Sequence, residues 1–339
     1  MFCRLDKKRL LMALCLSGWL AMACTGPAVL QESRMEYARW FSVLPDSRVV
    51  LCAPNGTVDT LRGPFHRIVC MSSSYVGFLE AIGAESTVVG VSGLQFLGSG
   101  NIHAIEAGYD AAINYEAILA ARPDLFLTYS VSAVDPPYLS KLRELGIRCA
   151  TVSEHLESHP LARAEYVKLF GALTGRQAEA DSVFRTVCAR YDSLKTDGGE
   201  KKKVLVNIPY RDQWYIPGGD NYMTRLIGDA GGTVLGAVPS RVESSVISVE
   251  TAFSYAQEAD FWLNPGWCRT KAQLRSVHPL FGDFPVLGKS VWNNTKQSAP
   301  GGGNAFWETG PARPDLVLED LRAIFDGREV PMNYYLEVR

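Results

Sequence analysis

The chain alternates strand-like and helical runs in two blocks, and a long helical stretch without strand signals separates the blocks. In the first block the expected strands are residues 67–71, 88–92 and 125–129. Apolar residues then recur at helical spacing from 161 to 194, and the alternation resumes at 204–208. Strands that alternate with helices at short intervals are typical of βαβ units. The sequence therefore predicts an α/β protein of two lobes, each with a central mainly parallel β-sheet flanked by helices, joined by one long α-helix.

This alternation divides the chain into five segments. They are a signal peptide at 1–23, an N-terminal extension with short strands at 24–64, an N-terminal lobe at 65–160, a connecting helical segment at 161–196 and a C-terminal lobe at 197–339. A helix of about twenty residues covers roughly 30 Å, which is enough to bridge two lobes. Of the residues, 47% are apolar, so both lobes can bury large cores.

The amino terminus indicates export. Basic residues precede the apolar run Leu10–Ala23, which is shorter than the roughly 20 residues needed to span a bilayer. Small residues lie just before Cys24, as in a bacterial lipoprotein cleavage site, so Cys24 is expected to become the acylated first residue. A plain secretory cleavage after Ala23 is the alternative. No other segment is apolar enough to span a membrane, so we expect a periplasmic or cell-envelope protein, lipid-anchored to a bacterial membrane.

Charge and cysteine usage exclude two classes of function. The formal net charge is −2, which gives no electrostatic basis for binding nucleic acid. The cysteines show no CxxC spacing, so a zinc site is not expected, and Cys70 and Cys149 lie in apolar runs typical of buried small hydrophobes. His155 and His159 have the spacing of one helix face, but Pro160 follows at once, which favours surface or capping roles over metal ligation.

A helix-start pattern occurs once in each lobe, with a glutamate in the same place. Asn114 and Ser248 are good N-cap residues, and Glu116 and Glu250 follow two positions later, where the positive end of the helix dipole stabilises an acid. Each lobe is therefore expected to present one carboxylate at a helix start. The alternative is that both glutamates only stabilise their own helices.

Several segments together resemble the periplasmic substrate-binding proteins of ABC importers that carry iron-siderophore complexes, haem or cobalamin. These segments are residues 67–93, 114–127, 215–219 with 231–232, and 306–321. The run from His155 to Glu165 is similar to a variant common among lipid-anchored members. The resemblance covers most of the mature chain and implies two lobes joined by one long helix, with the ligand held between them.

The resemblance also implies partners. In similar proteins one acidic residue on each lobe docks against arginines of the membrane permease, and Glu116 and Glu250 match those positions. Two exposed carboxylates at a fixed separation can orient a two-lobed body on a two-fold symmetric partner. We therefore expect an ABC permease and its ATPase as partners, a small-molecule metal chelate as ligand, and a monomeric protein without a cofactor of its own.

Loops at the carboxyl ends of the parallel strands are expected to line the ligand cleft. The candidate ligand-binding residues in these loops are Ser73, Ser74, Tyr75, Tyr129, Tyr210, Arg211, Trp214, Tyr215, Trp267, Trp292 and Asn293. Aromatic side chains offer flat apolar area, and a lone arginine can neutralise an anionic chelate. Core packing is the alternative for each aromatic residue, and Trp307 is expected to be structural.

The expected ligand is an organic metal chelate. A siderophore or similar iron chelate ranks first, cobalamin second and haem third, with Tyr75, Tyr129, Tyr210 and Tyr215 as candidate axial ligands for haem iron. Bare zinc or manganese is disfavoured because no histidine set is present. An exported hydrolase and a chelatase-like lipoprotein are the alternatives of another class, although no Gly-x-Ser-x-Gly elbow occurs and the resemblance indicates that the chain is not an enzyme.

Overall fold

The structure is a computed structural model, and it describes residues 35–339 except 99–101, 110–111, 131–134, 197 and 300. The predicted signal peptide and Cys24 lie outside the described residues. In the part that is described, none of the helices combines the length and the apolar character needed to cross a membrane.

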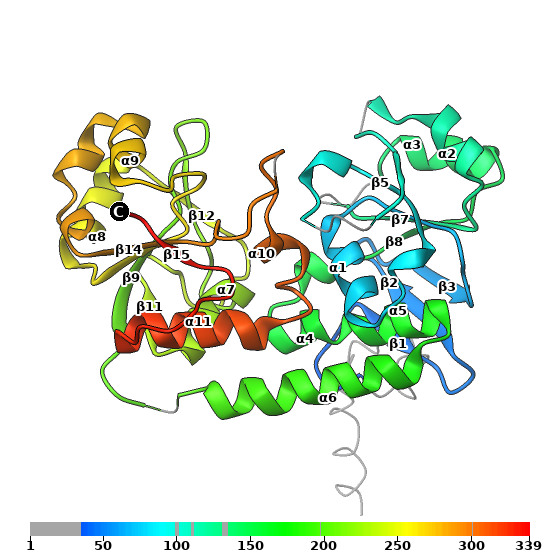
Figure 1. The fold of residues 1–339 in the computed structure, drawn as a ribbon, viewed down its shortest axis with the longest axis horizontal. Coiled ribbons are helices and arrows are strands. Elements are labelled where there is room, and N and C mark those ends of the chain that lie inside the picture. The colour runs from blue at the N-terminus through cyan, green and yellow to red at the C-terminus, as the bar shows by residue number, and fades with distance from the viewer. Residues whose placement is uncertain (1–34, 99–101, 110–111, 131–134, 197, 300) are drawn as a thin grey trace, which may run out of the picture. The chain divides into compact units, whose positions relative to one another are not determined.

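The N-terminal half contains a five-stranded parallel sheet in the order β6-β5-β4-β7-β8 (Figure 1). Its strands are β4 (Ile68–Cys70), β5 (Val88–Val91), β6 (Ile105–Glu106), β7 (Leu125–Thr128) and β8 (Cys149–Thr151). The helices of this half are α1 (Ser73–Ala81), α2 (Tyr115–Ala121) and α3 (Tyr138–Glu144), with short 3-10 turns at Glu85–Thr87, Leu94–Phe96 and Glu154–Leu156. The central strands are buried on both faces, as their apolar runs predict.

The C-terminal half repeats this architecture with one change. Its sheet has the order β11-β9-β13-β14-β15, in which only the edge strand β15 (Leu336–Glu337) is antiparallel to its neighbour. The parallel strands are β9 (Lys202–Val206), β11 (Gly232–Val234), β13 (Phe261–Leu263) and β14 (Ser290–Asn293). The helices are α7 (Tyr222–Asp229), α8 (Val249–Glu258), α9 (Lys271–Val277), α10 (Ala305–Glu308) and α11 (Pro314–Asp326), with 3-10 turns at Pro279–Asp283 and Pro285–Gly288. A separate antiparallel pair joins β10 (Trp214–Ile216) to β12 (Ser245–Ile247). The predicted α/β class, with mainly parallel sheets flanked by helices, is confirmed.

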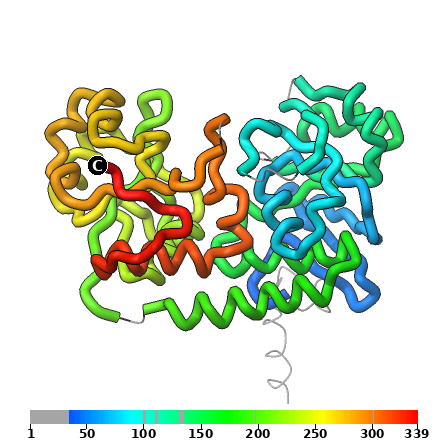
Figure 2. The backbone as a smooth tube through the Cα atoms, viewed as in Figure 1, coloured from blue at the N-terminus to red at the C-terminus, as the bar shows by residue number. Residues whose placement is uncertain are grey.

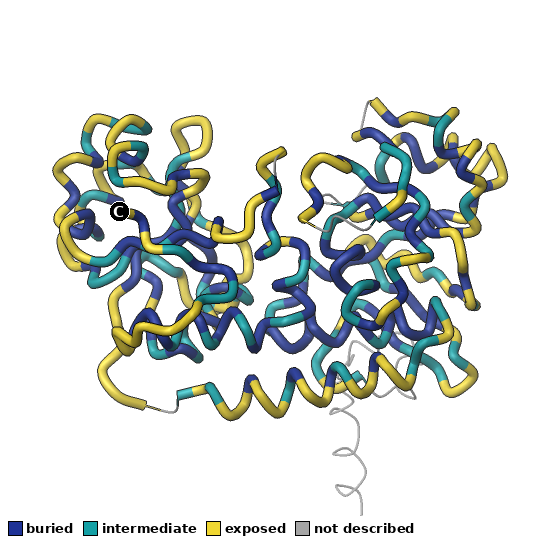
Figure 3. Tube along the Cα trace, viewed as in Figure 1, coloured by how far each residue is buried: buried dark blue, intermediate teal, exposed yellow. Residues whose placement is uncertain are grey.

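The predicted connecting segment is helical, but it is divided into three helices. These are α4 (Pro160–Ala164), α5 (Tyr166–Thr174) and α6 (Gln177–Leu194). Gly175 ends α5 in the left-handed conformation at φ 75°, which turns the chain before α6 begins. The long helix is therefore α6 alone, with 18 residues. Helices α5 and α11 both pack against the side of α6 that faces the body, along different parts of its length (Figure 1). The buried residues of α6 form a stripe on this side, and the rest of the helix is mostly exposed (Figure 3).

The extension before the first lobe forms an antiparallel meander of β1 (Phe41–Val43), β2 (Arg48–Cys52) and β3 (Val58–Arg62). Two buried carboxylates, one just before the connecting segment and one within it, hold the backbone that leads into this meander. Glu165 accepts hydrogen bonds from the N–H groups of residues 36, 37 and 38 at 2.8–2.9 Å. Glu157 accepts from those of residues 39 and 40 at 2.8 and 3.1 Å. The start of the described chain is thereby fixed to the joint between the two halves.

The two halves are connected by the helical segment and also by a second contact, which we call the second crossing. It is made by α10 of the C-terminal half, which lies over α1 of the N-terminal half. Helix α10 packs against α1 (Figure 2), and Gly77 of α1 lies so close that a Cβ atom there would collide with the backbone carbonyl of Glu308. The buried Glu308 carboxylate accepts a hydrogen bond from the Gly98 N–H at 2.7 Å. One hydrophobic cluster accordingly runs through both halves.

The cysteines of the described residues are all unpaired. Cys70, Cys149 and Cys268 are buried, while Cys52 and Cys188 are partly exposed. Burial raises the pKa of Cys149 to about 11, so its thiol stays protonated at neutral pH. The prediction that Cys70 and Cys149 act as buried small hydrophobes is confirmed.

Candidate functional site

A cavity of about 490 Å³ lies at the carboxyl ends of the strands of the N-terminal sheet. The chain runs from β4 to β5 and β6 in one direction and to β7 and β8 in the other, so the strand order reverses between β4 and β7. Ligands of open α/β sheets bind outside the carboxyl ends of strands at such a reversal. The cavity is lined by Met71, Ser72, Ser73, Ser74, Tyr75, Ser92, Tyr109, Tyr129, Glu154, His155, Arg163, Tyr222 and Trp307.

A buried polar network holds the serine loop of this cavity. The Ser74 hydroxyl donates to Oε1 of Glu154 at 2.8 Å, and the Ser72 hydroxyl lies 2.8 Å from that of Ser74. Arg163 donates to the other Glu154 oxygen from Nε at 2.8 Å and lies within 2.7 Å of it through Nη2. Both charged side chains are less than a tenth exposed. Such a pair fixes geometry, and the loss of either partner leaves an uncompensated buried charge.

The same network reaches the C-terminal half. The Arg163 guanidinium lies 4.3 Å from the centre of the Tyr222 ring, at the start of α7. Trp307 of α10 is 48% exposed and closes another side of the cavity. The cavity is therefore shared between loops of the first half and two aromatic side chains of the second.

His155 and Tyr129 form an edge-to-face pair in the cavity wall, with ring centres 6.0 Å apart. Burial lowers the pKa of His155 and outweighs the opposite effect of the Glu154 carboxylate, so the imidazole is neutral at neutral pH. Its Nε2 atom is shielded from water and has no hydrogen-bond partner among the described residues. Tyr129 is 41% exposed.

Tyr75 supports the cavity from below. Its side chain is fully buried, and its hydroxyl lies 3.1 Å from the carbonyls of Thr128 and Val152, beside the ends of β7 and β8. Burial raises the pKa of Tyr75 well above its ordinary value. The phenol is thus held as a neutral donor inside the sheet.

The structure brings four of the predicted ligand-binding residues together in this cavity: Ser73, Ser74, Tyr75 and Tyr129. Three others lie elsewhere. Trp214 is fully buried, donates from Nε1 to the Val206 carbonyl and stacks on Trp262. Asn293 is fully buried and donates to the carbonyls of Gly266 and Cys268. Trp292 lines a different cavity, between β14 and the end of α11.

The remaining predicted residues are exposed, three of them on loops beyond the carboxyl ends of the second sheet and Tyr215 in strand β10. Tyr210 and Arg211 follow β9, and the guanidinium lies 5.3 Å from the Tyr210 ring centre. Trp267 follows β13 and is 60% exposed. Tyr215 pairs in register with Val246 across the β10–β12 ribbon, and both side chains are exposed. None of them lines the cavity described above.

Nine of the thirteen cavity residues are absent from the predicted set, among them Glu154, His155, Arg163, Tyr222 and Trp307. Three of them lie in or beside the run from His155 to Glu165, for which the sequence suggested a family resemblance but no ligand-binding role. The expected surface or capping role of His155 is wrong because its ring lines the cavity. The capping role is confirmed for His159, whose Nδ1 accepts from the Leu161 N–H at 3.0 Å. Trp307, expected to be structural, lines the cavity and is exposed.

Glu116 and Glu250 both lie exposed in the first turn of a helix, as predicted. The Asn114 side chain accepts from the Ala117 N–H, and the Ser248 hydroxyl accepts from the Thr251 N–H. Hydrogen bonding from Ser248 lowers the pKa of Glu250.

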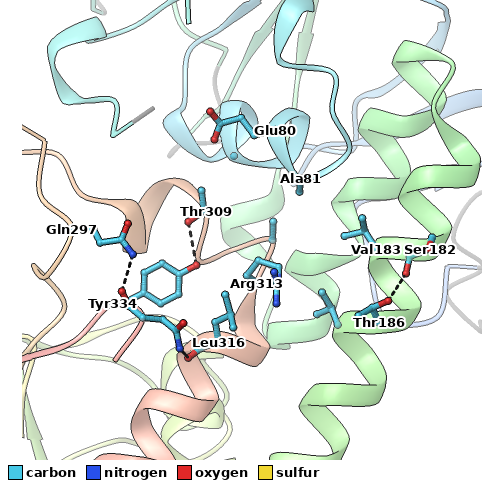
Figure 4. A pocket seen from close by; sticks show the side chains of 14 residues that line it. Glu80, Ala81, Ser182, Val183, Thr186, Gln297, Thr309, Arg313, Leu316 and Tyr334 are labelled. Carbon is cyan, nitrogen blue, oxygen red and sulfur yellow. Dashed lines mark hydrogen bonds between the residues drawn. The ribbon is translucent and has the colours of Figure 1, made fainter. Parts of the chain in front are cut away.

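A second cavity, of about 520 Å³, lies at the joint rather than at the strand ends (Figure 4). Helices α1, α6 and α11 border it, and the Tyr334 hydroxyl lies 3.1 Å from that of Thr309 at its wall. It is remote from the strand reversal and contains none of the predicted ligand-binding residues.

Comparisons with known proteins give one family model and a related lipoprotein. A family model described as periplasmic binding protein matches residues 68–278. An uncharacterized lipoprotein of Methanocaldococcus jannaschii is 27% identical over 291 residues, which cover 78% of this chain and 67% of that protein.

Two solved structures show the same fold. A periplasmic haem-binding protein of Pseudomonas aeruginosa has 18% identity and a TM-score of 0.59, with 81% of this chain and 98% of that chain covered. A possible iron-binding (periplasmic solute-binding) protein of Staphylococcus epidermidis has 18% identity and a TM-score of 0.57, with coverage of 78% and 99%.

Proposed function

This chain belongs to the periplasmic binding protein family, and we propose that it is the solute-binding component of an ABC importer that captures an organic iron chelate. The observation that carries the proposal is the cavity at the β4–β7 strand reversal, which is shared between the two halves and lined by serines, aromatic rings and a buried ion pair. Its volume of about 490 Å³ lies within the range of small-molecule sites. The family consists of solute-binding proteins, so the chain itself performs no chemistry on the ligand.

An iron chelate is the ligand class that the observations support best. The sequence favours a siderophore-type complex, and one of the structures with the same fold is described as a possible iron-binding protein. Haem is the alternative in the same role, because another related structure is described as haem-binding. Cobalamin needs only aromatic walls and hydrogen bonds, and it stands behind both. All three offer the flat or macrocyclic surface that exposed aromatic side chains contact well.

The chain works in the cell envelope, held by a lipid at Cys24. The family is extracytoplasmic by description, and the related archaeal protein is described as a lipoprotein. The basic and apolar leader before Cys24 supports the same location. From Cys24 to Glu36, where the carboxylate of Glu165 first holds the backbone, the chain has room for a short tether.

Native mass spectrometry and absorbance spectroscopy of the protein purified from its host test the ligand directly. The expected result is one organic molecule with one iron per chain, released together on denaturation. A protein that arrives without a chelate, and that binds none of ferrioxamine B, cyanocobalamin and haemin in titrations, contradicts the proposal.

Docking on the permease is assigned to Glu116 and Glu250. The double variant Glu116→Ala/Glu250→Ala is expected to abolish uptake in cells while the chelate affinity of the purified protein is unchanged, because both side chains are exposed and neither lines the cavity. Glu179→Ala is the matched control, since Glu179 is an exposed glutamate in the first turn of α6. A loss of affinity in the double variant contradicts this assignment.

A further inference from the structure

The loops at the carboxyl ends of the first sheet contain acidic residues but neither lysine nor arginine. These loops are residues 71–72, 92–104, 107–114, 129–137 and 152–159. Their acids are Asp110, Asp135, Glu154 and Glu157. This composition is a property of the sequence, so it includes the loop residues outside the described part of the chain. A permanent cation in the cavity must therefore come from another segment.

Arg163 of α4 supplies that cation, and its charge is already matched. Among the described residues that line the cavity, it is the one lysine or arginine. Its Nε and Nη2 atoms lie 2.8 and 2.7 Å from the same Glu154 oxygen, and its guanidinium lies 4.3 Å from the centre of the Tyr222 ring. The pair is buried, so it offers a ligand a fixed dipole but no net charge. His155 adds no charge at neutral pH, because burial lowers the pKa of its imidazole.

Glu106 places a further negative charge behind the cavity rim. It ends β6, and its carboxylate accepts hydrogen bonds at 2.7–3.0 Å from the backbone N–H groups of Gly93, Leu94 and Gly108. The nearby Tyr109 lines the cavity, and burial together with the Glu106 carboxylate raises the pKa of its phenol. A negative potential therefore extends to the rim.

The aromatic walls favour ligands of the same kind. Tyr109, Tyr129 and Trp307 line the cavity and are 43%, 41% and 48% exposed, so their rings are available to a ligand. The face of an aromatic ring is the negative side of its quadrupole and attracts cations. The hydroxyl groups of Ser73 and Tyr129 add uncharged hydrogen-bond donors. The described walls thus suit neutral or positively charged molecules and hold no unmatched cation for an anion.

We infer that this cavity selects its cargo by charge, and that the cargo is an iron chelate without net negative charge, of the ferric trihydroxamate class. This inference rests on the proposed function. In such a complex three singly charged hydroxamates balance ferric iron, and the amide and hydroxamate oxygens accept hydrogen bonds from hydroxyl groups. A tris-catecholate complex keeps excess negative charge, which would lie unmatched near Glu154 and Glu106. Like charges brought together in a desolvated site repel strongly.

Charge orders the candidate ligands for a reason that differs from the sequence-based one. A lone arginine was expected to neutralise an anionic chelate, but Arg163 is occupied by Glu154, and Arg211 does not line the cavity. Cyanocobalamin is neutral overall, so its charge suits these walls. Haem brings two carboxylates, which find no unmatched cation among the described residues of the cavity.

Three forms of one chelate test the inference. Ferrioxamine B carries a positive ammonium group, its N-acetyl derivative is neutral, and its N-succinyl derivative carries a negative carboxylate. Tryptophan fluorescence titrations of the full-length protein measure the three dissociation constants. The first two forms are expected to bind within about threefold of each other, and the third at least about tenfold more weakly. Added salt should reduce that difference, because ions screen the repulsion.

A lysine placed in the cavity wall should remove this preference. In Tyr129→Lys the added ammonium occupies an exposed cavity position, so the affinity ratio of the neutral to the negative form is expected to fall about tenfold. The ratio is the readout because the lost aromatic contact weakens both forms alike. Leu145→Lys is the matched control, since it adds the same charge at an exposed apolar residue outside the cavity, and its ratio should equal that of the wild type.

The outcomes separate this inference from the proposed function. If the wild type binds the N-succinyl form as tightly as the N-acetyl form, or binds haemin alone, the inference is overturned and chelate capture stands. Binding of cyanocobalamin alone supports the charge selection and removes iron from the proposed function. If the protein binds none of the ferrioxamines, haemin and cyanocobalamin, both fail.

Discussion

The loops at the carboxyl ends of the two sheets are built in opposite ways. In the N-terminal half, Ser74, Glu154 and Arg163 are buried and linked by hydrogen bonds of 2.8 Å. In the C-terminal half, Tyr210, Arg211 and Trp267 stand exposed, and the cation lies over an aromatic ring instead of beside a carboxylate. The first set of loops, which we call the first wall, is held by buried polar contacts and lines the cavity. The second set, which we call the second wall, is exposed, does not line that cavity and is only predicted to face the ligand.

This difference assigns separate tasks to the two walls. A prearranged polar wall loses little entropy when a ligand binds, so it can select geometry. Exposed aromatic side chains must be ordered by the ligand, so they add contact area at a cost in freedom. Stability should therefore depend on the first wall, while both should contribute to affinity.

The largest expected effect is on the buried pair. Arg163→Met leaves the buried Glu154 carboxylate without its cationic partner and is expected to lower the free energy of unfolding by about 3–5 kcal/mol in urea titrations. Arg211→Met is the matched change in the other wall, and it should alter stability by less than about 0.5 kcal/mol because its side chain is exposed. Equal effects of the two variants would remove the contrast between the walls.

The double variant Glu154→Leu/Arg163→Met sharpens this result. When both charges are replaced by apolar groups, most of the loss should be recovered, because the cost comes from the orphaned charge. Ser74 then lacks its acceptor, so recovery remains incomplete by about 1 kcal/mol.

An intermediate effect is expected from pH at His159, which caps α4. Burial lowers the pKa of His159 to about 4 from 6.5, so the folded state favours the neutral ring. As the pH falls below 6.5, the unfolded chain takes up a proton that the folded chain refuses until about pH 4, and stability declines across that window. Allowing for solvent screening, the decline is on the order of 1 kcal/mol. His159→Ser keeps a capping oxygen and is expected to flatten the pH dependence of unfolding, whereas exposed His66→Ala should leave it unchanged.

The smallest expected effect is on the exposed wall. Trp267→Ala should weaken binding of the best ligand among haemin and ferrioxamine B about tenfold, because one aromatic contact surface is worth about 1–1.5 kcal/mol. Its melting temperature should stay within a degree or two of the wild type, since the side chain is 60% exposed. In contrast, Ser74→Ala should lower stability by about 1 kcal/mol. Unchanged affinity in Trp267→Ala would show that the second wall does not face the ligand.

The fold was predictable because its signals are local. Apolar runs such as 67–71 and 125–129 become the central buried strands, and Asn114 and Ser248 cap the helices that they were expected to cap. The division of the connecting segment was less visible, since Gly175 breaks a helical pattern that otherwise continues into α6.

The candidate site was predictable only in part, and one pair of neighbours shows why. Trp214 and Tyr215 were both expected to face the ligand, but they are adjacent in strand β10, so their side chains point to opposite faces. Trp214 is buried and Tyr215 exposed, and local sequence does not say which face meets the core. His155 and Trp307 lie far apart in the chain, and their meeting at one cavity depends on the second crossing of α10 over α1.

That crossing also sets the order in which the molecule can mature. The side of α1 at Gly77 is completed by the backbone of Glu308, so the half of the chain that is synthesised first lacks one of its packing layers until almost the whole polypeptide has emerged. If the chain is exported amino terminus first, its N-terminal half reaches the envelope before α10 does. Until α10 arrives, the surface of α1 that α10 covers stays exposed to proteases. Truncated chains that end before α10 should therefore be degraded by proteases and should not accumulate as a stable domain.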